Sequence, residues 1–173
     1  MQRLRSSFDA DKMFGLFKSK DLTEKEARVT EIGKMLFAQI SVVRDKANAG
    51  QIDKSLFNQR INSMFAAGYL IGYVDEHLSE LFTDDKSKSK YAQRIYEGIF
   101  PGFGVKFIQS KLAARRLGET ISTDSDKYVD VFADCQEFDT GISSGRYEVC
   151  EYLASEEYTP NKLEGYLVTG QKE

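Results

Sequence analysis

Apolar residues in the first part of the chain recur at steps of three and four, which is the pattern of an amphipathic helix. From Glu26 to Asn48 one face of that helix would carry Val29, Ile32, Leu36, Ile40, Val43 and Ala47. Thr23 and Glu26 have the spacing of a capping box, and Gly50 suits a left-handed helix end. The pattern therefore predicts one long helix between Thr23 and Asn48.

A second long helix is predicted from Asp53, a good N-cap, to Leu81. Its middle, residues 65–74, is apolar nearly all round, which is typical of a helix buried on several sides. Gly68 and Gly72 lie four residues apart and so share a face. Each glycine weakens a helix by about 1 kcal/mol relative to alanine. We expect the close approach of another helix to compensate at this pair.

The rest of the chain predicts shorter elements. The polar run 83–90 has no apolar residue and is typical of a solvated loop. Helical spacing then covers 90–99, 105–117, 123–138 and 144–153, and a last short helix or strand covers 163–168. Pro101 and the Asp-Thr-Gly of 139–141 separate neighbouring helices. No alternating strand pattern of useful length occurs, so the sequence predicts an all-α fold, a compact multi-helix bundle of about six helices with two long N-terminal helices.

The length, 173 residues, fits one domain with its own hydrophobic core. We expect an irregular N-terminal segment, residues 1–20, and a single helical domain, residues 21–173. The apolar stretch Met13–Phe17 predicts either an alternative start at Met13 rather than Met1, or a short anchor that docks on the protein body. Membrane attachment through so short a stretch would need a second signal, so no membrane association is expected. With no secretory signal pattern, the expected location is the cytoplasm.

Charge is distributed unevenly along the chain. Residues 1–118 hold 20 Lys or Arg against 14 Asp or Glu, a net +6, whereas residues 119–173 hold 4 against 13, a net −9. The acidic part either folds onto the basic part or is reserved for a basic partner. Since the whole chain carries a formal charge of −3, it repels phosphate at long range, and we do not expect nucleic-acid binding.

The acidic part contains a ladder of carboxylates at helical spacing, the acidic stripe Asp126, Asp130 and Asp134. Like charges four residues apart on a helix repel one another. The stripe is interpreted either as a surface for a basic partner or as one that Lys111, Arg115 and Arg116 neutralise across the bundle. The second interpretation is preferred on the sequence.

Candidate chemistry is sparse. His77 is the single histidine, whereas helical carboxylate metal sites use histidines from two helices. Cys135 and Cys150 stand among carboxylates, which raise a thiol pKa, and are expected to be small buried residues rather than nucleophiles. No Gly-x-Ser-x-Gly or phosphate-binding loop motif occurs. We therefore predict no metal and no cofactor, and favour a protein without catalytic activity.

Two features remain as candidate sites. The glycine-rich connector 98–104 holds the candidate interface residues Ile99, Phe100 and Phe103, which either form a protein interface or fold under the bundle as a cap. The polar groups able to line an interior pocket are Tyr69, Tyr73, His77, Tyr91, Arg94 and Tyr96. The hypothesis is a non-catalytic helical protein acting through protein–protein interaction, as an adaptor, an immunity-like or chaperone-like factor, or a self-associating subunit. The alternative is an enzyme or small-ligand binder with a pocket inside the bundle.

Overall fold

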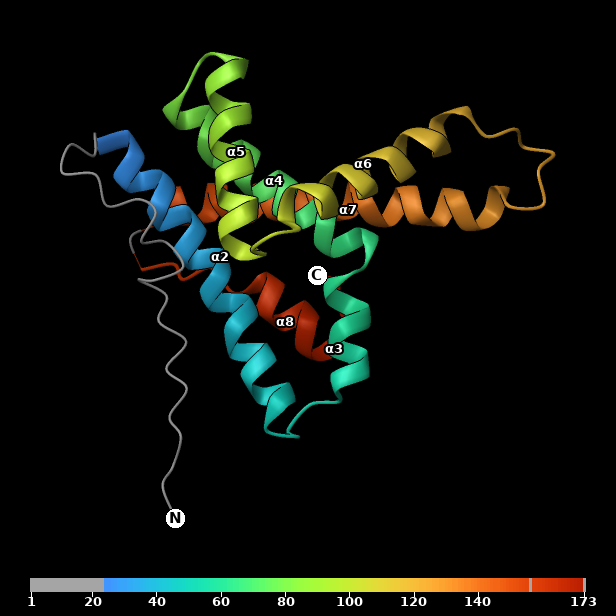
Figure 1. The fold of residues 1–173 in the computed structure, drawn as a ribbon, viewed down its shortest axis with the longest axis horizontal. Coiled ribbons are helices and arrows are strands. Elements are labelled where there is room, and N and C mark those ends of the chain that lie inside the picture. Colours follow the sequence, from blue (N-terminus) through green and yellow to red (C-terminus); the bar gives the residue numbers. More distant parts are fainter. Residues whose placement is uncertain (1–23, 156, 173) are drawn as a thin grey trace.

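The computed structural model describes residues 24–155 and 157–172, and these form a bundle of helices joined by short connections (Figure 1). The helices are α2 (Glu24–Asn48), α3 (Lys54–Ile61), α4 (Met64–Leu81), α5 (Asp85–Ile99), α6 (Gly104–Thr120), α7 (Tyr128–Ala154) and α8 (Lys162–Thr169). Within these ranges there is no strand, and the predicted all-α class is confirmed. The described part has seven helices rather than about six. The predicted Met13–Phe17 anchor and the Thr23 cap lie outside it.

Helix α2 buries the apolar face that the sequence predicts. Val29, Leu36 and Val43 are almost completely buried, and Ile32 and Ile40 lie between them. Burial of this apolar stripe against α4, α5 and α8 stabilises the helix far more than its intrinsic propensity does.

The predicted single helix from Asp53 to Leu81 is wrong, because the chain turns at Asn62 and Ser63. The Ser63 side chain accepts a hydrogen bond from the backbone N–H of Ala66 at 3.0 Å and so caps α4. The side-chain amide nitrogen of Asn62 donates to the backbone carbonyl oxygen of Asn58 at 2.8 Å, at the end of α3. The second long N-terminal helix is therefore two helices, and the turn lets α3 contact α8.

The predicted loop over residues 83–90 is also wrong. Asp84 accepts a hydrogen bond from the backbone N–H of Ser87 at 2.8 Å, and α5 begins at Asp85. A capped helix start needs no apolar residue in its first turns when that end is exposed to water. The polar run is thus the solvated first half of α5.

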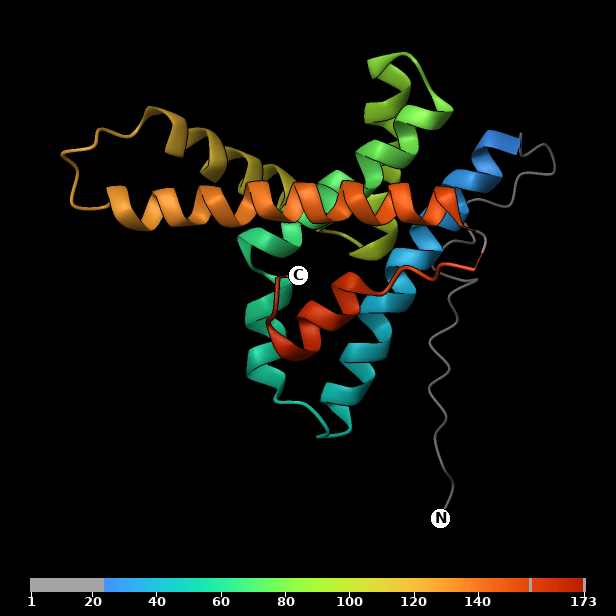
Figure 2. The same ribbon diagram turned by 180° about the vertical axis from the view of Figure 1, so that it is seen from behind.

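The predicted break at residues 139–141 is absent, and α7 runs unbroken for 27 residues. Gly141 lies inside the helix, where its missing side chain admits the backbone of α4. The first half of α7 and most of α6 extend away from the other helices as an arm, which both views show (Figures 1 and 2).

The crossing of α4 and α7 forms the centre of the molecule (Figure 2). A Cβ atom added at Gly72 would lie 2.2 Å from the carbonyl oxygen of Ile142. From the other side, a Cβ atom at Gly145 would lie 2.3 Å from the carbonyl oxygen of Tyr69. Such distances are far inside van der Waals contact, so two Gly-x-x-x-Gly pairs let the two backbones touch.

Helix α8 is held at both ends by side chains from other helices. The Glu148 carboxylate of α7 is fully buried, and its Oε1 accepts from the backbone N–H groups of Asn161 and Lys162, both at 2.8 Å. At the other end, the Arg60 guanidinium of α3 donates to the carbonyl oxygens of Leu167, Val168 and Thr169. These contacts satisfy backbone groups that a helix leaves unpaired at its ends.

None of the described helices is long and apolar enough to cross a membrane.

Candidate interaction surface and interior cavity

The connector between α5 and α6, residues 100–103, has a conformation that its glycines and its proline explain. Phe100 closes the end of α5, and Pro101 cannot continue that helix. Gly102 adopts a φ of 80°, in the left-handed region. Gly104 starts α6 so close to α5 that an added Cβ atom would lie 2.0 Å from the carbonyl oxygen of Tyr96. The connector is thus folded tightly against the end of α5.

A groove of about 270 Å³ lies between this connector and the helices α2 and α3. Its walls are mostly apolar, and they come from Ile40, Phe57, Ile61, Ile99, Phe100, Pro101, Phe103 and Phe107. Arg44, Asn58 and Asn62 supply its polar edge. Lys111 extends this edge, because its Nζ donates to the carbonyl oxygen of Asn62 and lies 5.8 Å from the Phe107 ring centre. The groove is therefore apolar within and basic at its rim.

The three candidate interface residues have different positions in this groove. Ile99 is buried in the core, Phe100 is half-buried, and Phe103 remains 51% exposed. The Phe100 ring packs on Phe103 at 5.3 Å and on Phe107 at 5.6 Å between ring centres. Ile99 and Phe100 thus close the core, as the cap interpretation describes. Phe103 presents an apolar ring to solvent, as the interface interpretation requires.

The six candidate pocket residues do not converge on one cavity. Tyr69 and Tyr73 are fully buried on α4, and their rings stack at 5.8 Å in the packed interior. Tyr91 and Arg94 lie on α5, where the Tyr91 hydroxyl donates to Glu26 Oε1 at 3.0 Å and the Arg94 guanidinium lies 3.6 Å from the same oxygen. These two link α5 to α2. Tyr96 is buried elsewhere on α5.

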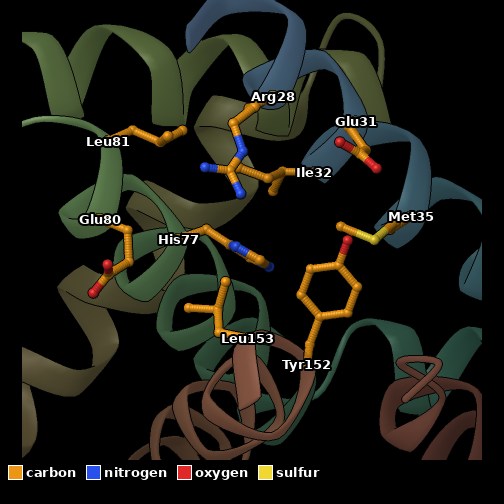
Figure 3. A pocket seen from close by; sticks show the side chains of 9 residues that line it. All are labelled: Arg28, Glu31, Ile32, Met35, His77, Glu80, Leu81, Tyr152 and Leu153. Carbon is orange, nitrogen blue, oxygen red and sulfur yellow. The ribbon is translucent and has the colours of Figure 1, made fainter. Parts of the chain in front are cut away.

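His77 does line a cavity, which lies between α2, the end of α4 and the end of α7 (Figure 3). Its volume is about 30 Å³, which is enough to hold a water molecule. The His77 ring points across it toward Tyr152, with 5.6 Å between ring centres, and Arg28 and Glu31 reach in from α2. The cavity has room for a solvent molecule and is much smaller than the groove.

The electrostatics at His77 keep its ring neutral. Burial, and after it the positive charge of Arg28, lower the pKa of His77 to about 4. Its Nε2 is buried and has no hydrogen-bond partner among the described residues. In the described residues no group of three His, Cys, Asp or Glu side chains could hold a metal ion.

Asp130 and Asp134 of the acidic stripe lie on α7 in the arm, whereas Asp126 lies in the turn before that helix, because α7 begins at Tyr128 and not near residue 123 as predicted. Asp126, Asp130 and Asp134 are all exposed, and they form no ion pair with any described residue. Arg115, expected to neutralise them, instead pairs with Asp139 and with Glu119, both at 3.0 Å. On other sides of the same part of α7 two apolar side chains are open to solvent, Val129 at 74% and Phe132 at 48% exposure. The arm is therefore both acidic and partly apolar.

Three features of the structure escaped the sequence reasoning. Gly141 and Gly145 are the partners of Gly68 and Gly72, and their matching four-residue spacing was a signal that could have identified them. Glu148 gave no signal, because its partners lie ten or more residues further along the chain. Cys150, expected to be buried, is exposed on the outer face of α7, whereas Cys135 is buried.

A comparison of the chain with known protein families, with curated proteins and with solved structures finds no match in any of the three.

Proposed function

We propose that this chain is a non-catalytic interaction protein that binds a segment of a partner protein in the groove beside Phe100 and Phe103. The observation that carries the proposal is the exposed ring of Phe103 at the mouth of an apolar groove of about 270 Å³. Exposed apolar side chains grouped around a concave surface are typical of protein interaction sites.

The rim of the groove indicates the chemistry of the bound segment. Arg44 lies at the edge of the groove. Lys111 is fixed at the same edge by the hydrogen bond that its Nζ donates to the carbonyl oxygen of Asn62. An apolar anchor side chain would replace water against Phe57, Phe103 and Phe107, and an acidic neighbour would meet the basic rim. We therefore propose a segment with an aromatic or aliphatic anchor next to Asp or Glu.

The alternative, an enzyme or ligand binder with a pocket inside the bundle, has less support. The cavity at His77 has about a ninth of the volume of the groove, and Tyr69 and Tyr73 are fully buried in packed surroundings. A ligand pocket is ordinarily several hundred Å³ in volume. A cytoplasmic location is part of the same proposal, since both cysteines are free thiols.

The test selects peptides from a random displayed library on the full-length protein and measures their affinity by fluorescence anisotropy. We expect enriched peptides to carry an apolar anchor beside Asp or Glu. Phe103→Ser should weaken their binding about tenfold or more, because the anchor loses its main contact. Tyr147→Ser on α7 is the matched control, since Tyr147 is also an aromatic residue about half exposed. If the enriched peptides bind Phe103→Ser as tightly as the parent, the groove is not the binding site.

A further inference from the structure

The chain carries a short apolar stretch before α2, residues 13–17, with the sequence Met-Phe-Gly-Leu-Phe. This apolar stretch lies outside the described residues. Four of its five residues are large and apolar, whereas residues 9–12 and 18–21 on either side of it are charged or small. A segment of this composition gains free energy when an apolar surface removes its side chains from water. The apolar stretch is therefore a candidate occupant for an apolar groove of its own chain.

The groove beside Phe103 offers such a surface. Phe57 and Phe107 line it, and the Phe103 ring is 51% exposed at its mouth. A second hollow, beside α8, is lined mainly by polar side chains such as Lys162 and Glu164. The cavity at His77 has about a ninth of the volume of the groove. Among these three hollows, the groove alone combines mainly apolar walls with a volume of about 270 Å³.

Helix α2 sets the distance that the chain must cover, because it follows the apolar stretch in sequence and also forms one wall of the groove. Ile40 in that wall comes 16 residues after Glu24, which is about 24 Å along a helix. Phe14 comes ten residues before Glu24, and ten extended residues span about 33–36 Å. The end of α5, where the connector begins, lies beside the middle of α2 (Figures 1 and 2). A chain that runs back along α2 is thus long enough to bring Phe14 to the groove.

The covalent link favours an occupant from the same chain over a free one. A segment joined to its site by a short linker meets that site at an effective concentration of about 1 mM. A contact with a Kd of only about 100 µM would then be formed about nine-tenths of the time. An outside peptide would in turn bind about tenfold more weakly than it binds an empty groove.

We propose that the apolar stretch occupies the groove of its own chain, with the Phe14 ring against Phe103, and that a partner protein must displace it in order to bind. The proposal rests on the proposed function of the groove and adds an internal competitor to it. Asp11, three residues before Phe14, corresponds to the acidic neighbour proposed for a bound segment. The groove would thus be autoinhibited, and its affinity for a partner would depend on release of the apolar stretch.

The first test measures the fluorescence anisotropy of a fluorescein-labelled peptide of residues 9–20 with variants of the full chain. Phe14→Ser with Phe17→Ser, the double variant, keeps the groove and removes its internal occupant. It should therefore bind the peptide about tenfold more tightly than the parent does. Phe8→Ser is the matched control, because Phe8 is also an aromatic residue before α2 but lies outside the apolar stretch. It should bind the peptide as the parent does.

The second test asks whether the groove is the site, with substitutions added to the double variant. Phe103→Ser should weaken peptide binding about tenfold or more, because the anchor loses its main contact. Asn58→Arg should have a similar effect, since Asn58 lines the groove from an exposed position on α3 and a larger side chain there obstructs it. This second substitution leaves the buried core unchanged, so it tests the site even if Phe103→Ser unfolds. Circular dichroism melts check the fold of each variant.

Sedimentation of the parent over a range of concentrations separates binding within one chain from binding between two chains. We expect a monomer at every concentration. A mass that rises with concentration, and does not rise in the double variant, would assign the apolar stretch to the groove of a second copy and overturn the proposal. The proposal also fails if the parent binds the peptide as tightly as the double variant, or if neither groove substitution weakens binding. Binding of library peptides that depends on Phe103 would still support the groove as an interaction site.

Discussion

Gly68 of α4 lies directly against the backbone of Phe138 of α7, where a Cβ atom would come within 2.1 Å of the Phe138 carbonyl oxygen. The same contact recurs from α7 toward α4, since a Cβ atom at Gly141 would lie 2.2 Å from the carbonyl oxygen of Phe65. Backbone atoms, unlike the tip of a flexible side chain, cannot move aside without shifting a whole helix. The glycines therefore set the distance between the two central helices.

Gly68→Ala should destabilise the protein despite the higher helix propensity of alanine. We expect a loss of about 3 kcal/mol in the free energy of unfolding, at the upper end of the range for overpacked cores. Gly165→Ala in α8 is the control, because no atom lies within 4 Å of a Cβ added there. It should gain up to about 1 kcal/mol from propensity alone. Urea denaturation measures both, and equal effects of the two substitutions would contradict backbone contact at Gly68.

His77 should make stability depend on pH. Its folded pKa is lowered to about 4 from an ordinary value of 6.5, so the folded state disfavours the proton that the unfolded chain binds. The contribution of the neutral ring is complete above pH 6.5 and decreases as the pH falls through the window from 6.5 to about 4. The loss approaches about 3 kcal/mol at the acid end.

Since His77 is the single histidine, its ring resonance in an NMR titration gives the pKa directly. The stability of His77→Gln, which has no titrating group at this position, serves as the reference at each pH and removes the effect of carboxylates. A folded pKa near 6.5, or a difference between the two proteins that is independent of pH, would show that burial does not control this ring.

Glu148 should matter as a hydrogen-bond acceptor rather than as a charge. Burial raises the pKa of its carboxyl group in spite of the hydrogen bonds from Lys162, Asn161 and Tyr158 that oppose the shift. Glu148→Gln keeps an acceptor oxygen and should lose less than about 1 kcal/mol, whereas Glu148→Ala leaves buried donors unpaired and should lose about 3 kcal/mol. Chemical denaturation gives both values. Equal losses would mean that the charge, not the acceptor, stabilises the start of α8.

Arg60 should hold the other end of α8 through its fork of donors. It reaches three carbonyl oxygens, at 3.1 Å for Leu167, 2.5 Å for Val168 and 3.2 Å for Thr169. Lysine has one donor nitrogen and cannot reach all three, so Arg60→Lys should lose about 1 kcal/mol. Hydrogen exchange should quicken in α8 and remain unchanged in α4. Unchanged protection of α8 would show that the guanidinium contributes nothing there.

The sequence determined the class of fold and the buried face of α2, because helical spacing of apolar residues is a local property. It also singled out Gly68, Gly72 and Phe103 as positions of interest. Prediction from the sequence was wrong where one local pattern is compatible with two structures. Asp139, Thr140 and Gly141 are typical of a helix break, yet Gly141 lies inside α7 because α4 needs the space of the missing side chain.

What only the tertiary structure decided is which distant residues meet. Glu148 caps the start of α8, and Arg60 donates hydrogen bonds to the carbonyl oxygens at its end. The tyrosines of α4 and α5 are distributed through the interior and do not line one pocket. The acidic stripe was left without the basic partner expected for it, since Arg115 pairs with Asp139 and Glu119. Local spacing fixes the face on which a side chain lies, but its partner depends on how whole helices cross, and that depends on contacts far apart in the chain.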